Sequence, residues 1–99
     1  MYQLRIRILA QQEADEIFDY YGNINSTLAL MFLEVLYAQL DVISENPELF
    51  QLKYKSTRVR YLRKFPFGIY YRIVDESFIE ILSIIHTSRN PEIWKKRKD

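Results

Sequence analysis

Cysteine is absent from the 99-residue sequence, which excludes a disulfide scaffold and thiol chemistry. Because there is also only one histidine, few soft ligands remain for a transition metal, and we predict neither a zinc site nor a cofactor. No stretch approaches the roughly 20 consecutive apolar residues of a membrane span, and the N-terminus has no basic segment followed by an apolar one. These absences predict a cytoplasmic protein that does not bind membranes.

Internal repeats, low-complexity tracts and linkers are absent as well. Hydrophobic residues make up 48% of the chain and aromatic residues 15%, enough for one compact core. We therefore predict a single domain over residues 1–99.

Charge is divided unevenly along the chain. Residues 1–50 hold two cations and eight acids, a net charge of −6, whereas residues 51–99 hold twelve cations and five acids, a net charge of +7. The total of +1 hides this asymmetry. The split predicts a local basic surface for an acidic partner, either a nucleic acid or an acidic protein segment.

The first half of the chain has the pattern of a strand followed by two helices. Apolar residues alternate with polar ones at Tyr2, Leu4, Ile6 and Ile8, which predicts a strand with one buried face. A helical spacing of apolar residues follows from Ala14 to Tyr21, and this helix is expected to end around Gly22 and Asn23. A second helix is predicted from the N-cap candidates Asn25, Ser26 and Thr27 to about Asn46, because Pro47 disfavours helical geometry in the residue before it.

The second helix is apolar on more than one face. Leu30, Leu33 and Tyr37 lie outside its main apolar stripe. They are either buried against both the first helix and a sheet or left as an apolar groove for a partner. We expect burial.

The second half of the chain has the pattern of three strands, at about residues 58–63, 67–74 and 78–86. Pro66 and Gly68 mark the first turn, and residues 75–77 form a short hairpin loop. The predicted fold class is α+β: an N-terminal strand, an antiparallel two-helix hairpin, then a three-stranded antiparallel meander, with the helices on one face of a largely antiparallel sheet. From Asn90 the tail resembles a capped helical turn.

A basic segment at residues 53–64 reads KYKSTRVRYLRK and contains no acid. Its cations, candidates for binding a target or nucleic acid, are Lys53, Lys55, Arg58, Arg60, Arg63 and Lys64. In a strand, Arg58 and Arg60 share a face with Cα atoms about 6.6 Å apart, so both guanidiniums can bind one phosphate. Tyr70 and other nearby tyrosines offer rings on which a base can stack. The alternative is a solvated edge that prevents unwanted strand pairing; the charge density favours binding.

Two residues of the last strands are further candidates. Arg72 is expected on the open face of the sheet, where it either stabilises charge on a phosphorane or pairs with Glu80 across the hairpin. His86, the only histidine, ends the last strand. Glu80, its nearest same-face carboxylate on that strand, is six residues and about 20 Å away, so no local acid/base dyad is expected. A purely structural role for His86 is at least as well supported.

The order of these segments resembles the RelE/ParE toxin superfamily, and its ParE-like branch in particular. The resemblance covers nearly the whole chain and includes the ENPELF end of the long helix. Its most specific parts are FP-x-x-I-x-Y-R, which ends at Arg72, and H-x-x-R-x-P-x-x-W, which runs from His86 through Arg89 to Trp94. We expect Trp94 to cover the core.

The resemblance implies the toxin of a type II toxin–antitoxin pair, neutralised by a cognate antitoxin protein. ParE-like members are associated with poisoning of DNA gyrase, whereas RelE-like members cut mRNA at the ribosome without a metal. As a nuclease, the chain would use Arg60, Arg72, His86 and Arg89. The sequence offers no obvious second titrating partner, which favours the gyrase target. A third alternative is a degenerate, non-toxic binding module.

Overall fold

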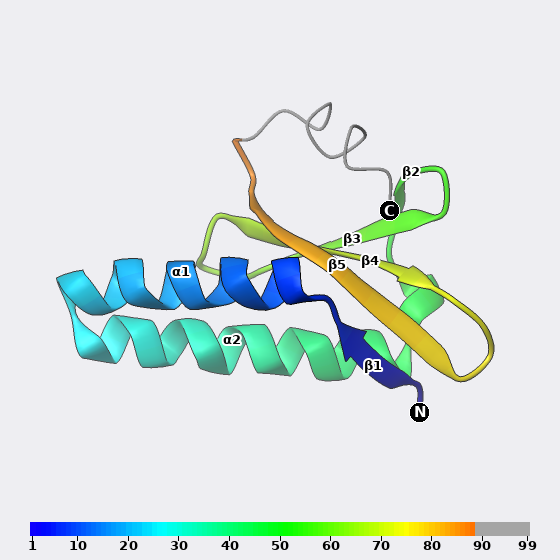
Figure 1. Ribbon diagram of the computed structural model, residues 1–99, viewed down its shortest axis with the longest axis horizontal. Helices are drawn as coiled ribbons and strands as arrows, with labels where there is room; N and C mark the ends of the chain where they lie inside the picture. The colour runs from blue at the N-terminus through cyan, green and yellow to red at the C-terminus, as the bar shows by residue number, and fades with distance from the viewer. Residues whose placement is uncertain (89–99) are drawn as a thin grey trace.

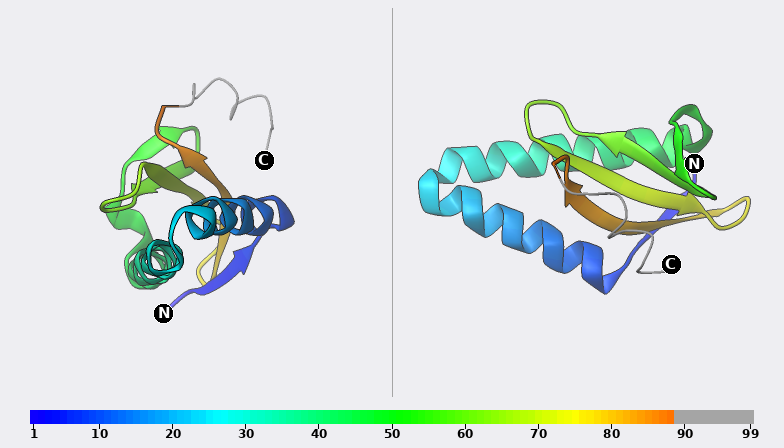
Figure 2. Two further views of the ribbon diagram at one scale, coloured as in Figure 1. Left: turned by 90° about the vertical axis from the view of Figure 1, so that its left-hand side faces the viewer. Right: turned by 90° about the horizontal axis from the view of Figure 1, so that it is seen from above.

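A helical layer covers one face of a five-stranded sheet (Figures 1 and 2). The computed structural model describes residues 1–88. In chain order these form β1 (Gln3–Ile6), α1 (Ile8–Ile24), α2 (Ser26–Glu45), the short 3-10 helix η1 (Pro47–Leu49), β2 (Leu52–Tyr54), β3 (Thr57–Tyr61), β4 (Phe67–Ile73) and β5 (Phe78–His86). This arrangement confirms the predicted α+β fold.

The sheet has the strand order β1-β5-β4-β3-β2. β3, β4 and β5 form the predicted antiparallel meander, and β1 joins its outer edge by pairing in parallel with β5. The chain between these two parallel strands comprises both helices and the strands β2, β3 and β4, which provides the long connection that a parallel pair requires. The edge strand β2 was not predicted, because three residues are too few to show an alternating pattern.

The boundaries of the helices follow their predicted signals, except at the start of α1. The Asn25 side chain caps α2 by accepting hydrogen bonds from the backbone N–H groups of Thr27 at 2.7 Å and Leu28 at 3.2 Å. α1 begins at Ile8, whose side chain is 78% exposed, and Ile6 is exposed as well. The prediction that these two residues continue the buried face of the first strand is therefore wrong, because the strand ends where α1 begins.

The main core lies between the helices and the sheet. The alternation of apolar residues in the sequence predicts that Phe67, Ile69, Tyr71 and Ile73 form the core face of β4, and the structure confirms it. Ile69 and Tyr71 are fully buried, and the other two pack against the same cluster. A smaller buried cluster lies on the opposite face of the sheet and comprises Val59, Tyr70, Leu82 and Ile85. A bulge in β5 opposite Tyr70 and Tyr71 shifts the alternation of that strand, so that Ile79 and Ile81 before it and Ile84 after it all face the main core.

Helix α2 is the core helix of the domain. It has 20 residues, and an 18-residue stretch of it has a mean hydropathy of 1.5, so by length and composition alone it could cross a membrane. Its residues Phe32, Leu36, Leu40 and Ile43 are buried in the main core instead. Packing within the domain therefore accounts for the apolar stripe of α2 that carries these four residues.

The expected burial of the wider apolar surface of α2 is wrong in part. Leu30 is 59% exposed and Tyr37 is 57% exposed, whereas Leu33 packs against the core. α1 packs along one side of α2, and neither α1 nor the sheet covers the side chains of Leu30 and Tyr37. An apolar surface is consequently left between and beside the two helices.

Candidate functional site

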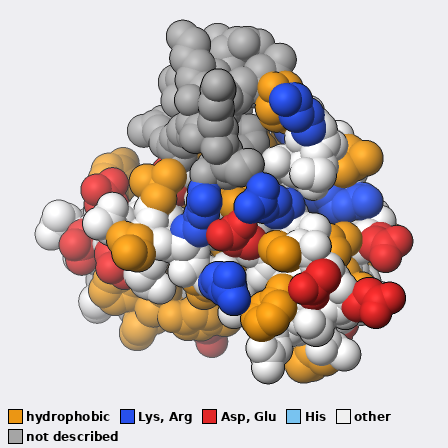
Figure 3. All heavy atoms as spheres, turned by 45° about the vertical axis from the view of Figure 1, so that its right-hand side comes forward, with side chains coloured by type: hydrophobic (Ala, Val, Ile, Leu, Met, Phe, Trp, Pro, Cys, Tyr) orange, Lys and Arg blue, Asp and Glu red, His pale blue; other side chains and the backbone are white. Residues whose placement is uncertain are grey.

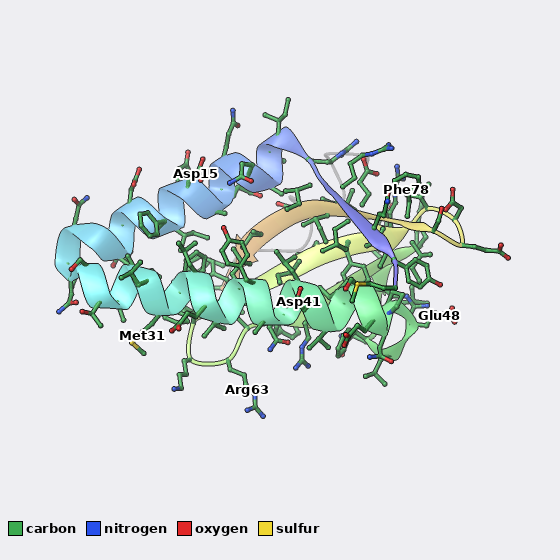
Figure 4. All side chains as sticks on the ribbon, turned by 90° about the horizontal axis from the view of Figure 1, so that it is seen from below. Asp15, Met31, Asp41, Glu48, Arg63 and Phe78 are labelled. Atoms are coloured by element: carbon green, nitrogen blue, oxygen red, sulfur yellow. The ribbon has the colours of Figure 1, made fainter. Side chains whose placement is uncertain are left out.

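The basic segment folds into β2, β3 and the loops at either end of β3. Lys53 and Lys55 lie at the β2–β3 hairpin, and Arg63 and Lys64 lie in the loop between β3 and β4; all four side chains are exposed. Figure 4 shows the Arg63 side chain extending away from the body of the domain. These four residues form what we call the basic loop surface.

Two lysines of the basic loop surface have left-handed backbone geometry. Lys55 has a φ of 51° and Lys64 a φ of 71°, and they are the only non-glycine residues with positive φ among residues 1–88. Such a conformation costs a residue with a Cβ about 1–2 kcal/mol. Backbone strain and exposed positive charge therefore coincide at both loops.

Arg58 lies on the same sheet face as Arg60, as predicted, but this face is turned toward the helices. Each arginine is paired with a buried β4 residue, Arg58 with Tyr71 and Arg60 with Ile69. The Nη1 group of Arg58 donates to the backbone carbonyl oxygens of Phe50 at 2.7 Å and Glu48 at 3.3 Å. This guanidinium thus holds the segment after α2, and its role in binding phosphate stays a prediction.

Arg60 contacts the same region. Its Nε atom donates to the Gln39 side chain at 2.6 Å, and its guanidinium lies 4.5 Å from the centre of the Phe50 ring. The Tyr71 hydroxyl donates to the Pro47 carbonyl oxygen at 2.6 Å. Burial raises the pKa of Tyr71 to about 12, although the nearby Arg58 and Arg60 act to lower it. Arg58, Arg60 and Tyr71 therefore all contact the ENPELF segment, residues 45–50, and hold it against the sheet.

Arg72 lies on the opposite face of the sheet and pairs with Glu80. Its Nη2 atom is 2.9 Å from a Glu80 carboxylate oxygen, and the Nε atom of Arg7 lies 3.2 Å from the other oxygen. The predicted pairing of Arg72 with Glu80 across the hairpin is thus confirmed. Charged side chains of both signs lie next to one another on the face shown in Figure 3.

His86 faces α1 rather than the cations. Its Nδ1 atom accepts a hydrogen bond from the Ser88 backbone N–H at 3.0 Å, and its ring lies edge-on to Phe67. A hollow of about 260 Å³ lies beside His86, and Glu13 and Glu16 of α1 line it. A strand pattern relates His86 only to carboxylates of its own strand, so these two were not predicted from the sequence. No sequence signal shows which face of α1 packs beside the end of β5.

Glu13 is hydrogen-bonded to β5 next to its bulge. One carboxylate oxygen accepts hydrogen bonds from the Ser83 hydroxyl at 2.6 Å and the Ile84 backbone N–H at 2.9 Å. The residue without a partner in β4 at the bulge is Leu82, so Ser83 and Ile84 are the two residues that follow it. Glu13 accepts from both across 70 residues of sequence or more, and it positions the segment that leads to His86.

Tyr70 is only 6% exposed and belongs to the smaller buried cluster. Its pKa is raised by burial and, to a smaller extent, by the neighbouring Tyr61. The prediction that Tyr70 presents its ring for base stacking is therefore at odds with the structure. Two other tyrosines lie beside the basic loop surface: the ring centre of Tyr61, which is 40% exposed, is 6.0 Å from the Lys53 ammonium, and that of Tyr54 is 5.3 Å from the Lys55 ammonium.

The residues proposed for nuclease chemistry do not meet at one place. Arg60 is on the helix-facing side of the sheet, Arg72 on the opposite side, and His86 about six residues along β5 from the partner of Arg72, which is about 20 Å. Arg89 and Trp94 lie outside the described residues. Among residues 1–88, no group of three or more histidine, aspartate or glutamate side chains is arranged to hold a metal ion.

Comparisons with known proteins identify the family. The model of the ParE toxin of the type II toxin–antitoxin system parDE matches residues 4–91. The fold is similar to that of a chain from the chromosomal ParDE TA system of P. aeruginosa, with a TM-score of 0.76 and 22% identity over 89% of this chain and 98% of that one. The curated proteins include no match. The family model spans nearly the whole sequence, and the chain therefore belongs to the ParE toxin family of type II toxin–antitoxin systems.

Proposed function

We propose that this protein inhibits growth from within the cytoplasm by binding DNA gyrase through the basic loop surface, and that a cognate antitoxin neutralises it. The observation that carries this proposal is the separation of Arg60, Arg72 and His86, while Lys53 and Lys55 at the β2–β3 hairpin and Arg63 and Lys64 at the other end of β3 are all exposed. A surface of this kind supports binding by charge rather than chemistry on a scissile phosphate.

Cleavage of mRNA is the second candidate, favoured by the carboxylates beside His86. General acid–base catalysis needs two titrating groups near the reacting atoms, and Glu13, Glu16 and His86 line one hollow. The acids in that hollow repel RNA phosphates, however, and Glu13 is already hydrogen-bonded to β5. The gyrase proposal is therefore preferred.

The two candidates are separated by expressing the protein in a bacterial host with and without its neighbouring gene. Growth, mRNA ends by primer extension, and plasmid supercoiling are followed in one culture. The variants are Lys53→Gln/Lys55→Gln, Arg63→Gln/Lys64→Gln, and the single variant His86→Gln. Arg5→Gln is the control, because Arg5 is an exposed cation of β1, outside the basic loop surface.

Gyrase poisoning requires growth arrest, altered supercoiling and intact mRNA, with rescue by the neighbouring gene. Each double substitution is expected to weaken the effect on purified gyrase about tenfold, because each removed contact between charges contributes on the order of 0.5–1 kcal/mol. His86→Gln and Arg5→Gln are expected to stay within twofold of the parent. New mRNA ends that disappear in His86→Gln would establish the nuclease instead. Absence of arrest in every form would leave a non-toxic binding module.

A further inference from the structure

The hairpin between β2 and β3 requires a left-handed residue at its tip. Tyr54 pairs with Thr57, so only Lys55 and Ser56 connect the two strands. Tight two-residue connections of this kind use a positive φ at their first residue, where glycine, asparagine and aspartate are favoured. Here that residue is Lys55, with a φ of 51°. The backbone thus explains the left-handed conformation, but it does not explain the lysine.

The loop between β3 and β4 is a second tight reversal. Leu62 and Phe65 are both buried in the main core, and the backbone N–H of Leu62 donates to the Phe67 carbonyl oxygen at 2.9 Å. Arg63, labelled in Figure 4, and Lys64 lie exposed between these two anchors. The left-handed φ of 71° at Lys64 allows the chain to reverse within two residues. A residue without a Cβ, or an asparagine, adopts this conformation at a lower cost.

Lysine is therefore the costly choice at both positions. The chain contains two glycines, and neither has a positive φ. Both left-handed residues within residues 1–88 are instead exposed lysines, so packing does not account for their identity. The Lys55 ammonium lies 5.3 Å from the centre of the Tyr54 ring, but an exposed contact of this kind is weaker than the strain. What remains is a role for the two ammonium groups outside the domain.

We propose that Lys55 and Lys64 dominate the binding of the basic loop surface to gyrase, and that each ammonium pairs with a separate carboxylate of the gyrase protein. This inference rests on the proposed function. Lys53 and Arg63, the other cations of this surface, have no positive φ, so the fold bears no cost for their identity. Their charges add attraction over a distance, whereas Lys55 and Lys64 make the direct contacts.

The arrangement of the cations favours carboxylates over DNA phosphates. Lys55 and Lys64 lie at opposite ends of β3, whose five residues alone span about 13 Å, so each reaches its own anion. A surface that binds duplex DNA typically neutralises roughly six to ten phosphates. The basic loop surface has only four cations, in two separated pairs. Two isolated pairs of this kind match acidic side chains on a protein better than a continuous phosphate backbone.

Two double variants of equal charge test this assignment. Lys55→Gln/Lys64→Gln and Lys53→Gln/Arg63→Gln each remove one cation from each end of β3. Binding to immobilised, DNA-free gyrase is measured by biolayer interferometry. The first variant is expected to bind about 25-fold more weakly than the parent, about fivefold for each lysine, and the second only about fourfold more weakly. Lys55→Arg/Lys64→Arg keeps both charges and should bind at least about fivefold more tightly than the matching glutamine variant.

Glycine substitutions separate binding from folding. Lys55→Gly and Lys64→Gly remove the strained Cβ, so each is expected to raise the melting temperature by about 3–6 °C while weakening gyrase binding about fivefold. Lys53→Gly and Arg63→Gly are the matched controls for stability, because they make the same chemical change without a positive φ to relieve. Their melting temperatures should fall. A variant that is more stable than the parent and binds more weakly has not lost binding by unfolding.

The outcomes distinguish this inference from the proposed function. If the parent binds gyrase and both double glutamine variants lose the same affinity, the basic loop surface acts as a whole, which overturns the inference and leaves the gyrase proposal intact. Glycine variants that bind as tightly as the parent also overturn it. Binding of a DNA duplex alone with the same dependence on Lys55 and Lys64 would replace the carboxylates with phosphates. A parent that does not bind gyrase overturns both proposals.

Discussion

Tyr71 joins the sheet to the segment that follows α2. Its ring is fully buried, and its hydroxyl donates to the Pro47 carbonyl oxygen at 2.6 Å. Replacing it with phenylalanine keeps the ring but leaves a buried carbonyl oxygen without this donor. We expect Tyr71→Phe to lower the free energy of unfolding by about 1–3 kcal/mol. Urea unfolding at pH 7 measures the loss.

Tyr20→Phe is the control for this substitution, because Tyr20 is 62% exposed on α1. Its free energy of unfolding should stay within about 0.5 kcal/mol of the parent. A loss in Tyr71→Phe no larger than that of Tyr20→Phe would show that the contact to Pro47 contributes nothing to stability.

Ionisation of the same hydroxyl lowers the free energy of unfolding at alkaline pH. The pKa of Tyr71 is about 12 in the folded protein, mainly because burial disfavours the phenolate, and its ordinary value is 10.0. The unfolded chain therefore releases this proton first as the pH rises. The stabilising contribution is complete below pH 10 and is lost between about pH 10 and 12.

Unfolding of the parent and of Tyr71→Phe at pH 8, 10 and 11.5 tests this dependence. The stability advantage of the parent should shrink by about 2 kcal/mol across the series. Tyr21 and Tyr70, whose pKa values burial also raises, are present in both proteins, so their contributions cancel in the difference. An advantage that stays constant with pH would contradict the assigned shift.

The bulge in β5 and the helix α1 depend on each other through Glu13. Glu13→Ala removes the acceptor of the Ile84 N–H and of the Ser83 hydroxyl, both in a buried segment. We expect a loss of about 1–3 kcal/mol in stability and faster hydrogen exchange at the Ile84 amide. Glu16→Ala, one turn further along α1 and exposed, should change neither. If Ile84 exchanged no faster in Glu13→Ala than in Glu16→Ala, the bulge would be stable without this carboxylate.

Elements that have a long periodic pattern were predictable from the sequence. α2 was delimited by Asn25 and Pro47, and the core face of β4 by the alternation from Phe67 to Ile73. Other elements depend on contacts between distant segments. β2 is defined by its pairing with β3 and β1 by its parallel pairing with β5, and no local signal specifies either partner.

The candidate site was less predictable than the fold. The run of cations without an acid identified the basic segment. It did not distinguish the exposed Lys53 and Lys64 from Arg58, whose guanidinium donates to the Glu48 and Phe50 carbonyl oxygens. Tyr70 and Tyr71 are adjacent in sequence, and both are buried, on opposite faces of the sheet. Such assignments require knowing what covers each face of the sheet, which is a property of the tertiary structure.

The whole molecule is electrically polarised between its two layers. Residues 8–46, which comprise both helices and the residues that follow them, carry a net charge of −7, and the other residues that the structure describes, 1–7 and 47–88, carry +5. The net charge of +1 and a pI near 7.9 therefore describe neither surface. Two partners of opposite charge can bind such a molecule at separate places, one on the helical layer and one on the basic loop surface.

Ion-exchange chromatography at pH 8 tests this polarity directly. A protein whose positive and negative charges are evenly distributed is retained weakly by either resin this close to its pI. A protein whose charges are separated can bind a cation exchanger through its sheet side and an anion exchanger through its helices. We expect retention on both. Substituting Lys53, Lys55, Arg63 and Lys64 with glutamine should reduce retention on the cation exchanger, and Asp15→Asn/Asp41→Asn should reduce it on the anion exchanger. If each set of substitutions shifted both columns only as its change in net charge requires, the two layers would not act as separate surfaces.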